Sequence, residues 1–525
     1  MKIVQIGEED WSVGLDLPED LEWFWVTEDK IQDFLDNQQA AEIAKLQVDE
    51  SDEEKTPPKI RLRYNAIVLT SSIREGLLLP LSSTIEAYSL FKQKDVTVDN
   101  QSDTGISRQK VLRDLPFQGS KQETIEYLYR NLFSGQYGAK LKIPEIDVNP
   151  NFTGKVQYDG NVGVIFDGQF GQDYETLFSF RYNLSSFSMS LELWPEFIKE
   201  SGDTSIRMEI IALRKGSLGE IYEIVHLDET QLLEPYVLQA NEEVGFYSIS
   251  FAVKGRGRLK FGVTHWRYSR EGLGKFILGG KGYSDCKRQE IFSYFNPGDM
   301  KPPLNVYFSG FRQAEGFEGF FMMKSMGAPF VLIADPRLEG GCFYSGTDEL
   351  ENNVKRAIQD ALDYLGFTRD QLILSGLSMG AFGALYYSAY FRQHALVVGK
   401  PFTNLGDSVM NLKLKRPDEF ETSGDMIRNV VGGSDQVAID QFNQHFWDKF
   451  APVSFDRTQF AIAYMEQDDY DGHALERLVE HLADSDTHIF AKGYEGRHND
   501  NSRAINRWFI AQYHHFLKNN FGREL

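Results

Sequence analysis

Short apolar runs alternate with helical segments from residue 304 to residue 517, and this alternation limits the possible fold more than any other feature. The apolar runs indicate buried strands and lie at residues 304–311, 329–336, 371–376, 395–401, 459–465 and 488–494. Helical spacing is clearest at residues 348–367, where Val354, Ile358 and Leu362 share one face. Strands separated by helices predict a parallel sheet covered on both faces.

Residues 1–150 are predicted to form a small α/β region. Apolar runs alternate there with helical patterns, at residues 2–7, 21–26, 30–46, 65–72 and 119–133. Ser120 precedes Glu123 by three residues, which is the spacing of a capping box. The acidic segment 49–58 is typical of a solvated linker. The region has neither a G-x-G-x-x-G nor a Walker pattern, so we predict no nucleotide site in it.

Residues 151–290 are predicted to form an all-β sandwich with jelly-roll character. Short runs rich in β-branched and aromatic residues lie at 162–170, 177–184, 187–194, 206–214, 245–253, 259–268 and 275–280. The glycines of segment 254–262 favour a hairpin turn over a phosphate site. Trp194, Trp266 and Tyr268 could stack on a sugar, but burial within the sheet is the favoured interpretation.

The composition narrows the classes of function. Lys and Arg number 55 and Asp and Glu number 77, which gives a net charge of −22. A chain this acidic is a poor candidate for binding nucleic acid or anionic lipid. Residues 1–14 carry acids where a signal peptide needs an apolar stretch, and no apolar run reaches the length of a bilayer. We expect a cytoplasmic protein, which a partner could hold at the inner face of the membrane.

The two cysteines support the same compartment. Cys286 and Cys342 lie in no CxxC pattern, so no zinc or redox motif is visible. Sparse cysteine fits a reducing cytoplasm.

Residues 376–380 read Gly-Leu-Ser-Met-Gly, between a predicted strand and a predicted helix. A nucleophile elbow holds its serine at such a turn, and its glycines are needed because neighbouring backbone comes too close for a Cβ atom. The five-residue pattern occurs often by chance. Its place inside a parallel α/β region favours Ser378 as a nucleophile over a simple turn.

A serine nucleophile needs a base and an orienting acid, which follow it in the order acid, histidine in α/β-hydrolases. The turn after residues 459–465 offers Asp468 as first choice, Glu466 as second and Asp469 as third, with Asp471 also in reach. His498 lies on a loop between the last predicted strand and the last helix, so we predict it as the base. Other histidines follow the turn but fit this place less well: His473, His481, His488, His514 and His515.

Two backbone N–H groups are predicted to form an oxyanion hole. One belongs to Met379, directly after the nucleophile, and the other to Phe311, on the loop after an earlier strand. Gly310, which precedes Phe311, fits a simple turn equally well. Residues 468–473 resemble a short divalent-cation loop but lack the length and final glutamate of an EF-hand, so we predict no metal site. No tightly bound cofactor is predicted.

Three segments resemble the serine-esterase branch of the α/β-hydrolases, most closely its esterase-D-like group: 376–385, 464–472 and 496–500. Where that group has a second glycine after the elbow, this chain has Ala381. The whole chain, which opens VQIGEEDW after three residues, is similar to a narrower family. This is the second member of the accessory Sec proteins of Gram-positive cocci. The resemblance implies three parts: an α/β region to residue 150, a β-sandwich over 151–290 and an α/β-hydrolase-like catalytic domain over 291–525.

This resemblance implies two activities. The first is export of serine-rich-repeat glycoprotein adhesins through a dedicated SecA motor and SecY channel, in complex with the first and third accessory Sec proteins. The second is O-acetylation of N-acetylglucosamine on the adhesin. Ser378 would then accept the acyl group, His498 would act as base and then as acid, and Asp468 or Glu466 would orient His498. The acetyl donor stays open, because no coenzyme A signature is readable.

Two alternatives stay open. A carbohydrate or acyl esterase would form the same acyl-enzyme and pass it to water instead of a sugar hydroxyl. A non-catalytic scaffold of the export complex would keep the hydrolase fold without its chemistry, and a strongly acidic chain of three regions suits partner docking.

Overall fold

The computed structural model describes residues 1–47, 60–117, 119–217, 219–415 and 423–524. The predicted linker at 49–58 therefore lies outside the described residues. The chain divides into two compact units, which we call the N-terminal unit and the large unit. The N-terminal unit comprises Met1–Gly135, Arg270–Gly279 and Asn296–Lys301, and the large unit comprises Gln136–Ser269, Gly280–Phe295 and Pro302–Leu525.

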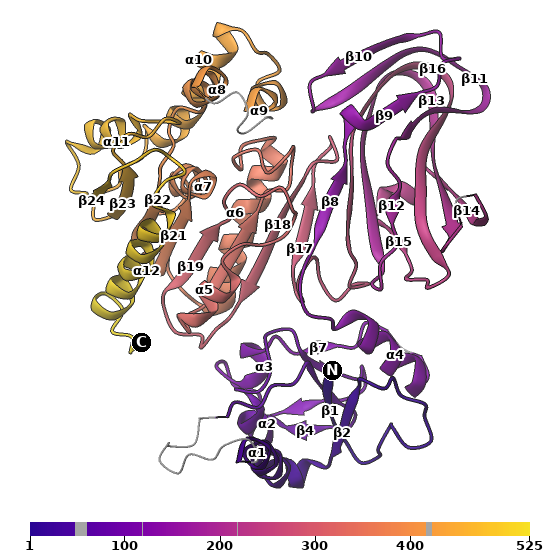
Figure 1. Cartoon of the computed structure of the whole chain (residues 1–525). Coiled ribbons are helices and arrows are strands. Elements are labelled where there is room, and N and C mark those ends of the chain that lie inside the picture. Colours follow the sequence, from indigo (N-terminus) through magenta and orange to yellow (C-terminus); the bar gives the residue numbers. More distant parts are fainter. Residues whose placement is uncertain (48–59, 118, 218, 416–422, 525) are drawn as a thin grey trace. The chain divides into compact units, whose positions relative to one another are not determined.

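The N-terminal unit is built on a parallel five-stranded sheet in the order β2-β1-β3-β5-β7 (Figure 1). Its strands are β1 Lys2–Ile6, β2 Glu22–Val26, β3 Ala66–Leu69, β5 Leu90–Lys92 and β7 Arg113–Asp114, with β4 Ile73–Arg74 and β6 Val98–Asp99 paired separately. Its helices are α1 Ile31–Gln47, α2 Glu75–Leu78, α3 Ile106–Gln109 and α4 Lys121–Asn131. The predicted capping box is confirmed, since Ser120 and Glu123 each accept the other's backbone N–H.

The first part of the large unit is a nine-stranded antiparallel sheet. Its strands are β8 Gly138–Leu141, β9 Ile146–Val148, β10 Lys155–Asp159, β11 Gly163–Phe180, β12 Leu184–Ser185, β13 Leu191–Arg214, β14 Ile221–Asp228, β15 Tyr236–Leu238 and β16 Val244–Tyr268. Six of the short runs expected from the sequence fall on just three of these strands, β11, β13 and β16.

These long strands bend back on themselves and close the sheet into a sandwich. Phe166 and Phe178 both belong to β11, yet their rings stack with centroids 5.7 Å apart. Phe251 and Phe261 of β16 likewise lie 5.2 Å apart. Gly255 has φ +97° at the bend, where a Cβ atom would lie 2.1 Å from the Asp203 carbonyl oxygen. The hairpin predicted at 254–262 is therefore wrong, because these glycines bend one continuous strand.

Both tryptophans of the sandwich strands are buried, as the favoured interpretation expected. Trp194 is 4% exposed, and its indole N–H donates to the Arg288 carbonyl at 2.8 Å. Trp266 is 9% exposed and stacks on Phe187. Neither ring offers a free face to a sugar.

The second part of the large unit is an eight-stranded sheet in the order β17-β18-β20-β19-β21-β22-β23-β24. Its strands are β17 Lys281–Ser284, β18 Glu290–Asn296, β19 Leu304–Phe308, β20 Phe330–Ala334, β21 Leu372–Leu377, β22 Ala395–Gly399, β23 Gln459–Met465 and β24 His488–Tyr494. The last six are parallel to one another. The predicted α/β-hydrolase-like sheet is thus confirmed.

Helices cover both faces of this sheet. They are α5 Phe320–Ser325, α6 Asp348–Leu365, α7 Met379–Ser388, α8 Leu405–Lys415, α9 Ser423–Val430, α10 Gln436–Phe450, α11 Ala474–Leu482 and α12 Ser502–Asn519. Helices α6 and α7 share one core with Val306 and Leu374. On the other face, Phe509 of α12 meets the edge of Tyr307, and Tyr513 donates to Ser375.

The boundaries expected at residues 150 and 290 differ from those of the sheets. Strands β8 and β9 precede residue 150 but pair with β16 and β11 of the sandwich. Strand β17 precedes residue 290 but pairs with β18 of the eight-stranded sheet. The run at 275–280 forms no strand, and Leu278 instead packs in the core of the N-terminal unit. Apolar content alone does not distinguish such a packed loop from a strand.

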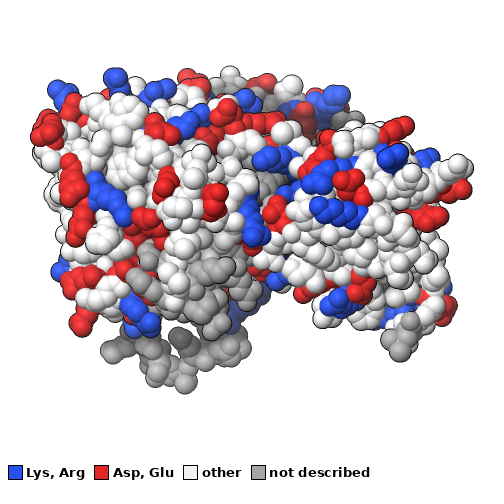
Figure 2. Space-filling view, turned by 90° about the horizontal axis from the view of Figure 1, so that it is seen from above, with Lys and Arg blue, Asp and Glu red and all other residues white. Residues whose placement is uncertain are grey.

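Charged side chains of both signs are mixed over the surface that Figure 2 shows. Every helix in the described ranges is too short or too polar to cross a membrane.

Candidate active site

Ser378 stands at a strained turn between β21 and α7. Its backbone has φ 54° and ψ −119°, outside the ordinary regions for a residue with a side chain. Its N–H donates to the Gly399 carbonyl of β22 at 2.8 Å, which fixes the turn against the neighbouring strand. The predicted elbow geometry is therefore present.

The two glycines of the elbow are required by close backbone contacts. A Cβ atom on Gly376 would lie 2.2 Å from the carbonyl group of Gly380. A Cβ atom on Gly380 would lie 2.0 Å from the carbonyl oxygen of Phe308 in β19. Neither position has room for a larger residue, because both neighbours are backbone.

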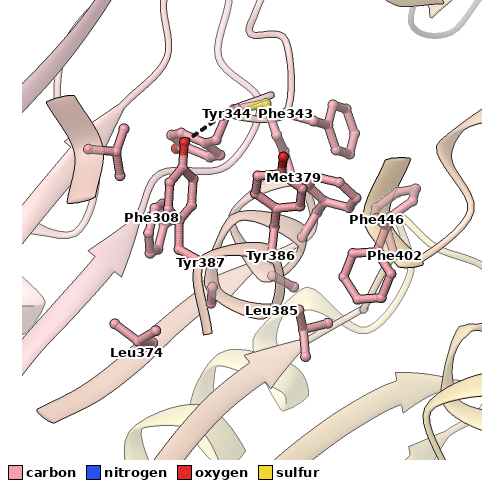
Figure 3. Close-up of a cluster of buried hydrophobic side chains, with 14 of the residues drawn as sticks. Phe308, Phe343, Tyr344, Leu374, Met379, Leu385, Tyr386, Tyr387, Phe402 and Phe446 are labelled. Carbon is pink, nitrogen blue, oxygen red and sulfur yellow. Dashed lines mark hydrogen bonds between the residues drawn. The ribbon is translucent and has the colours of Figure 1, made fainter. Parts of the chain in front are cut away.

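The helix after the elbow is held by an aromatic cluster. Figure 3 shows Met379, Tyr386 and Tyr387 of α7 packed among residues of the surrounding strands and loops. Tyr387 stacks on Phe308 at 5.5 Å and donates its hydroxyl to the Tyr344 carbonyl at 2.9 Å. Packing on every side keeps the N-terminus of α7 at the serine.

His498 and Asp468 complete a hydrogen-bonded series with Ser378. The Ser378 Oγ lies 2.9 Å from His498 Nε2, and His498 Nδ1 lies 2.9 Å from Asp468 Oδ2. Asp468 follows β23 and His498 follows β24, at the same edge of the sheet as the elbow. The geometry matches the relation of nucleophile, base and orienting acid in serine hydrolases.

The other acids of the turn are placed elsewhere. Glu466 is exposed directly after β23, and the carboxylate bonded to His498 Nδ1 is that of Asp468. Asp469 accepts the backbone N–H of His498 at 3.1 Å. Asp471 is buried and accepts from Arg477 at 2.7 Å and from the Thr403 N–H at 2.8 Å. Among the described residues no group of three or more acids, histidines or cysteines could hold a metal ion.

Asp468 is held as a carboxylate. Burial raises its pKa, but the hydrogen bond and charge of His498, with the backbone N–H groups of Tyr470 and Asp471, together lower the pKa below its ordinary value. The charged form is the one that stabilises an imidazolium at His498.

The His498 ring is 1% exposed and is fixed by aromatic neighbours. Tyr470 stacks on it at 4.2 Å with an interplanar angle of 5°, and Phe402 lies 5.0 Å away. Lys400 supports the same loop, donating to the Asp500 carbonyl at 3.0 Å and to the Ser502 hydroxyl at 3.2 Å. Sequence reasoning missed Tyr470, Phe402 and Lys400. The aromatic within the acidic turn was the only local signal.

The predicted oxyanion donors lie at the start of α7 and on the loop after β19. Met379 begins α7, so its N–H is among those that have no acceptor within the helix. Phe311 follows β19, which pairs with β21. Two consecutive glycines pack against these side chains. A Cβ atom on Gly340 would lie 2.2 Å from the Phe311 ring, and one on Gly341 would lie 2.4 Å from the Met379 sulfur. The Gly310 N–H is already used, because it donates to Glu318 at 2.7 Å.

The loop that carries Phe311 is anchored to the sandwich by a buried ionic cluster. Glu315 has a fully buried side chain and lies 2.5 Å from His265 Nδ1, 2.5 Å from Arg267 Nε and 3.1 Å from Lys140 Nζ. Arg267 also lies 2.6 Å from Glu290. All three cationic partners belong to strands β8 and β16 of the sandwich, so the sandwich determines where this loop sits.

Replacing Asp468 by Asn should lower kcat by about 10⁴-fold, because Asn cannot hold the tautomer and charge that the ring of His498 needs. The same change at Glu466 should leave kcat within twofold, about the scatter of a neutral surface change. Both rates are measured on an activated acetyl ester with the full chain. Equal losses in the two variants would contradict the assignment of Asp468.

Comparisons with known proteins agree with this architecture. The family model of the accessory Sec system GspB-transporter matches residues 1–523. An accessory Sec system protein of Streptococcus gordonii is 35% identical over 525 residues, which covers 100% of this chain and 99% of the relative. One of Staphylococcus aureus (strain NCTC 8325 / PS 47) is 38% identical over 467 residues, 88% of each chain.

A solved structure extends the likeness to three dimensions. A chain of the Glycosylation Associate Protein (Gap123) complex from Streptococcus agalactiae superposes with a TM-score of 0.91 at 38% identity. The match covers 100% of this chain and 99% of that one. With the family model matched from end to end, this chain belongs to the accessory Sec system GspB-transporter family.

Proposed function

We propose that this protein is a serine-dependent O-acetyltransferase that modifies N-acetylglucosamine on a serine-rich-repeat glycoprotein and serves its accessory Sec export. The observation that carries the catalytic half is the series Ser378–His498–Asp468, with both hydrogen bonds at 2.9 Å. A chain retained only as a scaffold has no need of a strained serine, its two crowded glycines and a buried histidine–carboxylate pair.

The proposed reaction has two acyl transfers. Ser378 Oγ attacks the carbonyl carbon of the acetyl donor while its proton passes to His498 Nε2, and the donor's leaving group departs with that proton. The sugar hydroxyl then gives its proton to Nε2 as its oxygen attacks the acyl carbon. The C–O bond to Ser378 breaks and the proton returns to Oγ. Met379 and Phe311 N–H groups would stabilise the oxyanion in both steps.

The glycan acceptor and the partners rest on the family. The Streptococcus agalactiae chain belongs to the Glycosylation Associate Protein (Gap123) complex. We propose that this chain assembles likewise with the first and third accessory Sec proteins and meets the accessory SecA motor at the membrane. That assembly also favours the scaffold alternative. The scaffold and acetyltransferase roles are compatible, because the triad occupies only one edge of one sheet.

The test is co-expression of the glycosylated adhesin with the wild-type chain or with Ser378→Ala, followed by mass spectrometry of the released glycans. We expect acetylated N-acetylglucosamine with the wild type only. Purified wild type that releases acetate equally fast with and without glycopeptide would instead be an esterase. Unmodified glycans with both chains, while export continues, would leave only the scaffold role.

A further inference from the structure

The N-terminal unit contains an open cleft of about 450 Å³ that the proposed acetyl transfer does not use. Its lining comes from segments directly after the strands of the parallel sheet. Glu8 and Glu9 follow β1, Thr70 and Ser71 follow β3, and Gln93 to Asp95 follow β5. Since parallel strands end at one edge, these polar groups meet at the carboxyl edge of the sheet.

The cleft lies where the direction of chain winding reverses. The connection from β1 to β2 packs Trp11 and Leu15 on one face of the sheet. The connection from β2 to β3 packs Ile31 and Leu35 of α1 on the other face. Strands β1 and β3 are neighbours, so a crevice opens between their loops. Ligands of doubly wound sheets bind at this switch point, and this strand order is that of flavodoxin-like folds.

A buried glutamine holds the two loops of the crevice in place. Gln5 has no exposed surface, and its amide donates to the Glu9 carbonyl at 2.7 Å and to the Thr70 hydroxyl at 2.9 Å. Its own carbonyl accepts the Trp11 N–H at 3.0 Å. The cleft is therefore formed before any ligand arrives, which lowers the ordering cost of binding.

The charges of the lining disfavour an anionic ligand. Three carboxylates, Glu8, Glu9 and Asp95, line the cleft with two ammonium groups, and Lys121 is already paired with Glu9 at 2.6 Å. The N-terminus of α4 is not open to a phosphate either, because Ser120 and Glu123 cap each other. A phosphate would meet carboxylates where phosphate sites present free N–H groups.

We propose that this cleft binds a neutral saccharide. Carboxylate oxygens accept hydrogen bonds from sugar hydroxyls, while Gln93 and Ser71 both donate and accept. Leu115 and Phe117 add apolar surface for the C–H face of a ring. This mixed set suits an uncharged ligand with many hydroxyl groups. The site would let the N-terminal unit hold a glycan independently of the triad.

Calorimetric titration of the full chain with glucose, N-acetylglucosamine and glucose 6-phosphate tests this site. We expect saturable binding of at least one neutral sugar, with glucose 6-phosphate binding more weakly. Asp95→Ala should weaken binding about tenfold, as loss of hydrogen bonds to one charged group predicts. The control Asp103→Ala should bind like the wild type, since Asp103 is a fully exposed acid of the same unit outside the cleft.

Ser378→Ala separates this site from the proposed catalytic one and should bind sugar with unchanged affinity. Circular dichroism and the thermal midpoint confirm that each variant is folded. The proposal is overturned if no neutral sugar binds, if glucose 6-phosphate binds best, or if Asp95→Ala and a second variant, Gln93→Ala, both leave the affinity unchanged. Loss of binding in Ser378→Ala would assign the sugar to the triad instead.

Discussion

Ser378→Ala should reduce the rate of acetyl transfer and of acetyl-ester hydrolysis by about 10³- to 10⁶-fold. Its Oγ is the atom that lies 2.9 Å from His498 Nε2, and no other hydroxyl is bonded to that ring in the described residues. Residual activity would come from binding and from the oxyanion donors alone. Because the substitution removes one oxygen atom from a half-buried site, the fold and the thermal midpoint should change little.

Ser375 provides the matched control for that variant. It lies three residues earlier on β21, and its buried hydroxyl donates to the Val306 carbonyl at 2.8 Å. Ser375→Ala removes that bond and also the acceptor of the buried Tyr513 hydroxyl, so it should cost about 2–3 kcal/mol of stability while keeping kcat within a few-fold. Steady-state kinetics and urea unfolding of both variants measure the contrast. Full activity in Ser378→Ala would refute covalent catalysis at this residue.

The geometry of the elbow could be predicted because it depends on local sequence. A strand, two glycines around a serine and a helix form a unit whose close contacts are set within a few residues, apart from the Phe308 carbonyl. The order acid then histidine, each after a strand, followed from the parallel sheet. The spacing after the strand ranked Asp468 above Glu466 but left both open, because the two residues are only two positions apart on the same turn.

The sandwich was harder to predict because its contacts are distant in sequence. Gly255 interrupts the apolar pattern of β16, and a strand that bends at a glycine gives the same local signal as a hairpin. Only the pairing of Asp203 and Thr204 with the other side of the bend distinguishes the two. The partners of Glu315 were invisible for the same reason, since Lys140 and His265 lie on different strands far away in the chain.

Glu315→Ala should destabilise the large unit by about 3–5 kcal/mol, because it leaves Arg267 and Lys140 buried without their shared carboxylate. It should also lower kcat, since the same loop carries Phe311. The control is Glu339→Ala, which removes another ion pair between the part with the eight-stranded sheet and the sandwich, Glu339 with Lys142 at 2.7 Å. That pair is partly exposed and should cost less than about 1 kcal/mol.

The pH dependence of this cluster checks the same prediction. Burial raises the pKa of Glu315, but Arg267, His265 and Lys140 outweigh it and hold the pKa far below its usual range. Its stabilisation is therefore complete above about pH 4.3, the unfolded value, and is lost as the pH falls toward the folded pKa.

The contribution of His265 to stability depends on pH in the opposite direction. Burial lowers its pKa, but the charge of Glu315 and the bond to Glu196 raise the pKa above its ordinary value. Its contribution is complete below about pH 6.5 and declines as the pH rises through the folded pKa. The free energy of unfolding of the wild type should thus exceed that of Glu315→Ala by the largest amount between about pH 4.3 and about pH 6.5. Urea unfolding across that range measures this difference. If the difference in unfolding free energy between the two proteins stays constant from about pH 4 to about pH 9, the cluster does not titrate as a unit.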